Sequence, residues 1–167
     1  MKYTGPAPFK IYVDADACPV KEEIYRVATR YRATVYLVSN QMLSPPLRDG
    51  LVAKSIKVGM ALDAADDWIV DHIGRGDLCI TADLPLTARV IDLGGLTCSP
   101  RGHVHDARSI SEALASRDLM TALREQNAGR GDGQLGGPAP MNQKARSAFL
   151  NGLDRIAQRS LRIKRSK

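Results

Sequence analysis

The chain has 167 residues, of which 44% are apolar, and this length and composition are typical of a globular protein with a hydrophobic core. No run approaches the roughly 20 consecutive apolar residues that a membrane-spanning helix needs, so no membrane partner is expected. The length also predicts a single domain over residues 1–167. The first residues lack the apolar segment of a signal peptide, so we predict a cytoplasmic protein. The cysteine count of three is odd, which argues against a disulfide framework.

The net charge of +6 is unevenly distributed along the chain. Residues 1–143 hold 16 Lys and Arg against 17 Asp and Glu, whereas residues 144–167 hold eight against one. A basic block of this kind suits a phosphate backbone, and a solvated terminus is the alternative. The sequence therefore predicts a basic C-terminal tail over about 158–167 and favours nucleic acid as a partner.

Strand-like and helix-like patterns alternate through the first two thirds of the chain, which predicts an α/β fold with a mostly parallel sheet. The predicted strands cover residues 9–13, 34–38, 55–58, 78–82 and 96–98. The predicted helices begin at Pro19, cover about 64–73, 86–93 and 109–125, and resume after Asn142. We expect a three-layer α/β fold in which about five strands are flanked by helices, with further helices at the C-terminus.

Two local patterns stand out in the last third of the chain. Ser109, followed by Glu112 three residues later, has the form of a capping box and predicts the start of a helix. Residues 127–143 hold five glycines and two prolines and almost no apolar side chains. This composition predicts a flexible surface loop.

Acidic side chains follow two of the predicted strands and surround the start of one predicted helix. They are Asp14, Asp16, Asp63, Asp66, Asp67 and Asp83. Because the carboxyl ends of parallel strands meet at one edge of a sheet, we expect these carboxylates to converge. Hard divalent cations prefer oxygen ligands and would offset the mutual repulsion. The sequence therefore predicts a site for Mg²⁺ or Mn²⁺ at this edge.

Helix capping is the alternative explanation for some of these acids. Asp83 could cap the helix that follows it, and Asp63 with Asp66 could form a capping pair that the helix dipole favours. Capping does not account for Asp14 and Asp16, because like charges two residues apart at a strand end repel without a counter-ion. We therefore weigh a metal-carboxylate cluster above capping alone.

Polar and basic side chains could complete a substrate site. The candidates are Ser39, Asn40, Thr81, Arg101, Arg155 and Arg159. The first three lie at strand ends and could hydrogen-bond a ligand or only their own turns. The arginines, in the loop after the fifth strand and in the basic last helix, could contact phosphates.

Cys18 and the histidine pair His103 and His105 are weaker candidates. Cys18 precedes a predicted helix N-terminus, where the dipole would lower the pKa of a thiol, but no histidine is near it in sequence, so a packing role is favoured. The two histidines could bind a metal in an extended segment, although a histidine pair in a loop is more often neither ligand nor base.

Four sequence strings carry a family resemblance. They are VDADACPVK at 13–21, DAADDWI at 63–69, GDLCITADLPL at 76–86 and PRG at 100–102. Over residues 10–154 the chain resembles the YaiI/YqxD family of uncharacterised bacterial proteins, which is similar to the PIN-like and NYN-like nuclease folds. Members of those folds hold Mg²⁺ or Mn²⁺ with acidic residues at strand ends and cut RNA.

The resemblance implies a PIN-like domain with a particular set of metal-site residues. That set is Asp14, Asp16, Asp66, Asp67 and Asp83, with Asp63 as a further candidate. Residues 136–138 and 151–154 also resemble C-terminal motifs of the family, which makes Asp154 another acidic candidate. One departure from the broader PIN pattern is that the helix acids here are all aspartates.

We expect a metal-dependent phosphodiesterase that acts on RNA, more than on DNA, with Asp14 and Asp83 as catalytic residues that hold Mg²⁺ or Mn²⁺. Two alternatives stay open. A phosphatase resembling the haloacid dehalogenase group would use Asp14 as nucleophile and Asp16 as acid/base, with Lys54 completing the site. A non-catalytic nucleic-acid-binding protein would depend on the basic tail.

Overall fold

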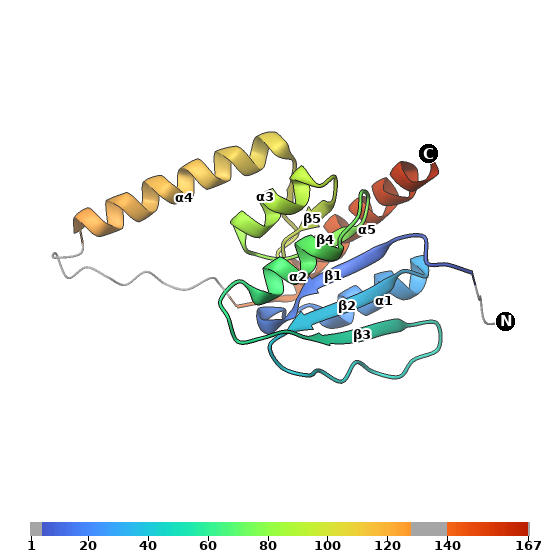
Figure 1. The fold of residues 1–167 in the computed structure, drawn as a ribbon. Helices are drawn as coiled ribbons and strands as arrows, with labels where there is room; N and C mark the ends of the chain where they lie inside the picture. The colour runs from blue at the N-terminus through green and yellow to red at the C-terminus, as the bar shows by residue number, and fades with distance from the viewer. Residues whose placement is uncertain (1–4, 128–139, 167) are drawn as a thin grey trace.

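Six strands form one sheet in the computed structural model, which describes residues 5–127 and 140–166 (Figure 1). The strands are β1 (Lys10–Asp14), β2 (Thr34–Ser39), β3 (Val52–Lys57), β4 (Leu78–Ile80), β5 (Leu96–Cys98) and β6 (Val104–His105). The sheet order is β3-β2-β1-β4-β5-β6, and each neighbouring pair is parallel except β5 and β6. The predicted mostly parallel sheet is confirmed, with the two-residue β6 as an addition to the expected strands.

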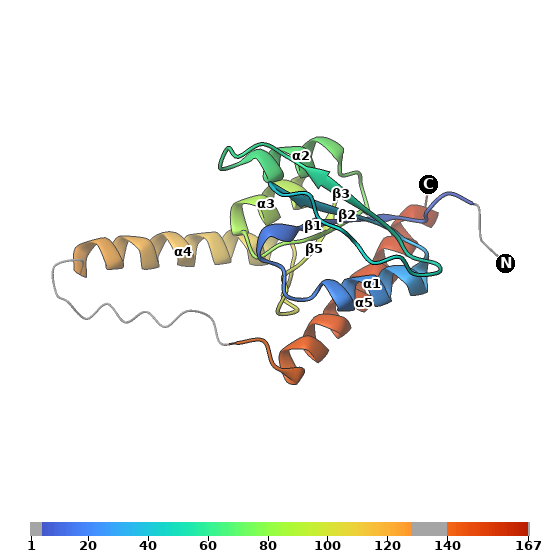
Figure 2. The same ribbon diagram turned by 90° about the horizontal axis from the view of Figure 1, so that it is seen from below.

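Helices cover both faces of this sheet. They are the short 3-10 helix η1 (Ala15–Ala17), α1 (Lys21–Tyr31), α2 (Ala64–His72), α3 (Leu84–Asp92), α4 (Ala107–Asn127) and α5 (Gln143–Arg165). Figure 2 shows α1 and α5 on one face and α2 and α3 on the other, while α4 extends away from the body. The predicted three-layer α/β fold with C-terminal helices is therefore confirmed.

The central strand β1 shows how the sequence builds the two cores. Ile11 and Val13 are buried with side chains of α1 and α5, whereas Tyr12 between them is buried with side chains of α2 and α3. Successive side chains of a strand point to opposite faces, and a parallel sheet covered on both sides is apolar on both. The carboxylate of Asp14 follows this apolar run at the end of the strand.

The strand order creates a topological switch point between β1 and β4. From β1 the chain moves outward through β2 to β3, and α2 then carries it back to β4 on the other side of β1. The connections that follow β1 and β4 thus leave toward opposite faces of the sheet, an arrangement that in open α/β sheets opens a crevice outside the carboxyl ends of the two strands. In open α/β sheets this crevice is where ligands bind.

Helix α5 runs from the edge where the strands end to the edge where they begin. Near its start, Gly102 in the turn after β5 approaches it so closely that an added Cβ would lie 2.6 Å from the carbonyl oxygen of Ala148. Near its end, Lys164 Nζ lies 3.0 Å from Oδ1 of Asp77, which directly precedes β4. The described part of the basic tail therefore lies at the sheet edge opposite Asp14.

The first turn of α4 differs from the prediction. Asp106 Oδ1 accepts a hydrogen bond from Ser109 N at 2.8 Å, and Ser109 Oγ accepts one from Asp106 N at 2.9 Å. This reciprocal pair is the capping box, so the helix begins at Ala107. Glu112 instead pairs with Arg108, and the predicted Ser109–Glu112 box is wrong.

Other element boundaries shift by two or three residues. Helix α1 begins at Lys21 rather than Pro19, and β3 begins at Val52 because it pairs with β2 along the whole length of that strand. Of the predicted Gly/Pro-rich loop at 127–143, residues 128–139 lie outside the described residues. Within the described ranges, no helix combines the length and apolarity that crossing a bilayer requires.

Asp77 is the buried acid that fixes α5 to the sheet. It is 4% exposed, and its carboxylate accepts hydrogen bonds from Lys10 N at 3.1 Å and Gly74 N at 2.9 Å besides pairing with Lys164. We predict that Asp77→Ala lowers the free energy of unfolding by about 2–4 kcal/mol, because two N–H groups and a cation lose their partner. Urea unfolding of this variant, beside the exposed-site control Asp71→Asn, measures the loss. Equal stability of both variants would contradict the anchoring role.

Candidate functional site

At the switch point, side-chain hydrogen bonds link the end of β1 to the residues that follow β4. Asp14 ends β1, and the hydroxyl of Thr81, the residue after β4, donates to Asp14 Oδ2 at 3.1 Å. The same hydroxyl accepts from the backbone N–H of Asp83 at 3.0 Å. Thr81 is 3% exposed, so its rotamer is held by its surroundings. One buried hydroxyl thus orients the first carboxylate and the backbone that carries a second.

A second hydroxyl and carboxylate pair joins β1 to β2. The turn η1 presents Asp16, which is exposed, and the hydroxyl of Ser39 at the end of β2 donates to Asp16 Oδ1. Ser39 is 1% exposed and also accepts from Gln41 N at 3.1 Å. Asn40, half-buried, follows at the same strand end. The structure therefore brings the four polar residues predicted at the ends of β1 and β2 to one edge.

Asp66 enters the same crevice from the first turn of α2. Its pKa is raised to about 6, first by burial and then by the negative charges of Asp83, Asp14 and Asp63. The pKa of Asp14 is also raised, chiefly by burial and further by the charges of Asp16 and Asp83, against the hydrogen bond from Thr81. Carboxylates from three separate elements thus lie within electrostatic reach of one another.

We call Asp14, Asp16, Asp66 and Asp83 the acid cluster. Asp83 has a second role that the sequence anticipated, since its Oδ1 accepts from Leu86 N at 2.8 Å and caps α3. The capping bond accounts for one of its oxygens and holds the side chain in a fixed orientation.

The other predicted acids stand outside the cluster. Asp63 occupies the position before α2 but makes no capping hydrogen bond with its side chain, so the alternative explanation of Asp63 as a capping residue gains no support. Asp67 is exposed and pairs with Arg89 of α3 at 3.0 Å. Successive residues of a helix point about 100° apart, which separates Asp67 from Asp66. Arg89, which also lowers the pKa of Asp66, carries no sequence signal because only the packing of α2 on α3 brings it there.

The remaining predicted binding residues are spread more widely. Arg101 is half-buried in the turn between β5 and β6, at the sheet edge where the strands end. Arg155 and Arg159 are exposed on α5, and Asp154 beside them is bound by Arg30 at 3.2 Å and by Tyr31 at 2.6 Å. The C-terminal motif acid is therefore part of the contact between α1 and α5.

The donor chemistry of the acid cluster fits a hard divalent cation, with a limit on geometry. Across residues 5–127 and 140–166, no group of three or more His, Cys, Asp or Glu side chains is already arranged as metal ligands. Mg²⁺ commonly keeps several waters and takes one or two carboxylates from a protein. The residues present therefore fit a cation held by two carboxylates and water, and they do not form a closed all-protein cage.

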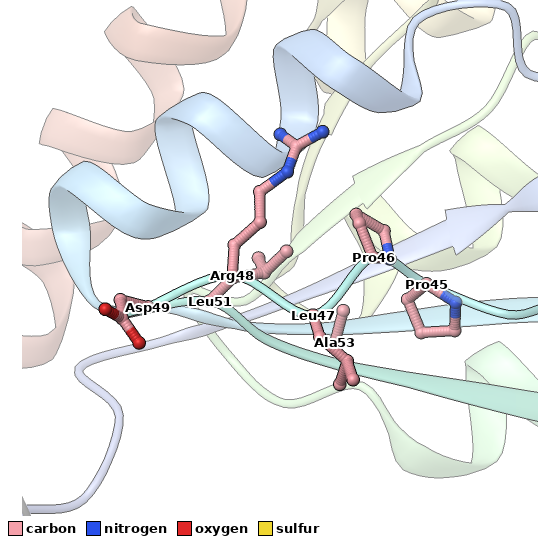
Figure 3. Close-up of a pocket in the computed structure, with 7 residues that line it drawn as sticks. All are labelled: Pro45, Pro46, Leu47, Arg48, Asp49, Leu51 and Ala53. Atoms are coloured by element: carbon pink, nitrogen blue, oxygen red, sulfur yellow. The ribbon is translucent and has the colours of Figure 1, made fainter.

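Two further features lie outside this chemistry. Burial raises the pKa of the Cys18 thiol, which disfavours a thiolate nucleophile there. A pocket of about 340 Å³ is lined by residues 45–49, Leu51 and Ala53, on the loop between β2 and β3 and the start of β3 (Figure 3). Figure 3 shows Arg48 directed toward α1, where it pairs with Glu22. None of the acid cluster lines this pocket.

Comparison with known proteins assigns the family. The protein-family model described as "Uncharacterized BCR, YaiI/YqxD family" matches residues 12–159. The chain belongs to the YaiI/YqxD family. It is 45% identical over 150 residues to a UPF0178 protein of Azorhizobium caulinodans, a match that covers 89% of each chain. It is 42% identical over 155 residues to a UPF0178 protein of Geobacter sulfurreducens, covering 92% of this chain and 99% of the relative.

No solved structure matches the chain, so the relation of the YaiI/YqxD family to PIN-like folds stays a prediction. The family match contains the whole acid cluster and ends at Arg159, within α5. The predicted membership is confirmed.

The raised pKa of Asp66 gives the YaiI/YqxD protein a testable pH dependence. Well below pH 4 this carboxyl is protonated in both folded and unfolded chains, whereas between about pH 4 and 6 the unfolded chain loses the proton first, so stability falls as the pH rises. We predict that Asp66→Asn raises the free energy of unfolding at about pH 8 by about 1 kcal/mol, a value reduced for solvent screening, and leaves it unchanged at about pH 3.

Chemical unfolding at both pH values measures this difference. The matched control is Asp71→Asn, an exposed aspartate on the same helix, which we expect to change stability at neither pH. A destabilised Asp66→Asn variant at high pH would show that the Asp66 carboxylate has a favourable partner instead of the repulsion described here.

Proposed function

We propose that this protein is a metal-dependent phosphodiesterase that acts on RNA or another nucleic acid at the acid cluster. The observation that carries the proposal is that aspartates from the ends of β1 and β4 and from α2 share the switch-point crevice, where burial and repulsion from neighbouring carboxylates raise the pKa values of Asp14 and Asp66. Such repulsion destabilises the fold unless a cation offsets it, and groups with perturbed pKa values in a cleft are typical of functional sites.

In this proposal Asp14 and Asp83 hold the cation. Both carboxylates are fixed before anything binds, Asp14 by the Thr81 hydroxyl and Asp83 by the backbone N–H of Leu86. A bound Mg²⁺ or Mn²⁺ supplies two kinds of chemistry, since it lowers the pKa of water and neutralises charge that develops on a phosphate. The chain's own contribution is a preorganised pair of oxygen ligands at the edge of a rigid sheet.

Asp66 and Asp16 would assist this pair. The pKa of Asp66, about 6, is suited to an oxygen that accepts a proton from water near neutral pH. Asp16 is exposed and held by Ser39, so it is available to an approaching ligand. Asp67 is not part of the proposed site because it pairs with Arg89.

The substrate class rests on the resemblance and on composition. Nuclease folds similar to this family cut RNA, and the predicted cytoplasmic location would give access to it. Aromatic residues make up 5% of the chain, which favours contacts to the backbone over base stacking and thus little sequence preference.

The phosphatase alternative gains no support from side-chain positions. It would need a cation such as Lys54 beside Asp14, yet Lys54 lies within β3 with its Nζ 5.9 Å from the centre of the Tyr36 ring.

The test combines metal binding and cleavage on the same samples. We predict that Asp14→Asn with Asp83→Asn weakens Mn²⁺ binding, measured by calorimetry, at least about 10-fold and slows cleavage of single-stranded RNA at least about 100-fold, because both proposed ligands lose their charge. Asp71→Asn, which removes an exposed carboxylate of α2 outside the cluster, serves as the control and should match the wild type.

The other outcomes separate the alternatives. A wild type that binds no Mn²⁺, or a double variant that cuts as fast as the wild type, would overturn the proposal. Phosphate trapped covalently on Asp14 would favour the phosphatase, and salt-dependent RNA binding without any cleavage would favour a non-catalytic binding protein.

A further inference from the structure

A row of exposed arginines lies along the outer face of α5. Arg155, Arg159 and Arg162 are spaced four and three residues apart, which aligns them on one side of a helix over about 10 Å. All three are exposed. Within the described part of the chain, none of them forms a salt bridge. We call these three residues the arginine stripe.

The helix offers the stripe no counter-charge of its own. Asp154 is the one acid in the α5 sequence, and it is already bound by Arg30, Tyr31 and Gln158. Like charges three and four residues apart destabilise a helix, so the stripe works against helix formation. The helix dipole favours basic residues in the last turn, which accounts for Arg162 but not for Arg155 and Arg159.

Two other basic side chains of α5 have structural roles. Lys164 pairs with the buried Asp77, and Arg146 is 3.1 Å from Oε1 of Glu23 and 3.1 Å from the Pro19 carbonyl oxygen. These two residues lie toward the ends of the helix and fix it to the body. The arginine stripe lies between them, and its members are exposed and make no salt bridge with any described residue.

We propose that the arginine stripe binds the phosphate backbone of an RNA strand, as a surface separate from the acid cluster. Arginine binds phosphate through a planar fork of donors, and a row of such groups suits a repeating polyanion. From the carboxyl ends of the β-strands, the proposed path of the RNA passes Arg101 in the turn after β5 and continues along α5, which packs against β5 (Figure 2). This path of the RNA rests on the proposed function, whereas RNA binding to the arginine stripe is independent of it.

This arrangement implies a polymeric substrate. The acid cluster lies where the strands end, whereas α5 carries the stripe toward the edge where they begin, so one nucleotide cannot contact both. An RNA long enough to reach both the acid cluster and the arginine stripe gains affinity from the stripe, whereas a dinucleotide at the acid cluster does not.

The test is binding of a single-stranded RNA of about 20 nucleotides in the presence of a chelator, so that no cleavage interferes. We predict that Arg155→Gln/Arg159→Gln/Arg162→Gln raises Kd at least about 10-fold and reduces the slope of log K against log salt by about 2, as expected for three phosphate contacts to a single strand. Glutamine keeps the helix propensity, and circular dichroism confirms that the variant folds.

The matched control is Arg108→Gln/Arg117→Gln/Arg124→Gln, which removes the same charge from exposed positions of α4. We expect its Kd to stay within about 3-fold of the wild type, since it preserves the stripe. Equal effects of the two triple variants, or binding to anionic vesicles without binding to RNA, would overturn the inference.

The two proposals fail separately. RNA binding that depends on the stripe, in a protein that cuts nothing with Mn²⁺, would remove the proposed function and leave this inference standing. RNA cleavage and binding that are the same in the stripe variant and the wild type would remove this inference and leave the proposed function.

Discussion

The hydrogen bond from Thr81 to Asp14 is the interaction on which the arrangement of the site depends. It crosses the switch point, where the parallel pairing of β1 with β4 sets the two residues side by side at the strand ends. The same hydroxyl receives the N–H of Asp83, so the first carboxylate, the strand end and the N-terminus of α3 form one rigid unit. A change in the register of β4 would separate all three at once.

The buried Asp77 and the half-buried Asp66 have opposite electrostatic surroundings. Asp77 has a cation and two N–H groups around its carboxylate, and it anchors α5. Asp66 is surrounded by the charges of other aspartates, with Arg89 as the opposing cation, and its pKa rises to about 6. Folded proteins tend to satisfy local preferences, so a group of mutually repelling carboxylates at the switch point marks a candidate site.

The edge of the sheet that carries Asp14 and Asp83 could be predicted from the sequence because parallel strands end on the same side and each acid follows an apolar run. The pairing of Asp67 with Arg89 could not, since it depends on how α3 packs against α2. The direction of α5 was also hidden, because the Lys164–Asp77 contact spans much of the chain. Local patterns fix which elements form, whereas long-range packing decides which side chains meet.

The separation of opposite charges has a consequence for the proposed reaction. The pairing of Arg89 with Asp67 shows what happens when an arginine reaches an exposed aspartate of this protein: each neutralises the other. An arginine beside Asp14 and Asp83 would compete with a cation in the same way and would close the site. In the proposed reaction, placing the stripe on α5 would leave the acid cluster negative and open to a divalent ion, while a different element would hold a strand of phosphates. The repulsion between the cluster and a phosphate would then be offset only when the ion is bound, which would couple substrate approach to metal binding.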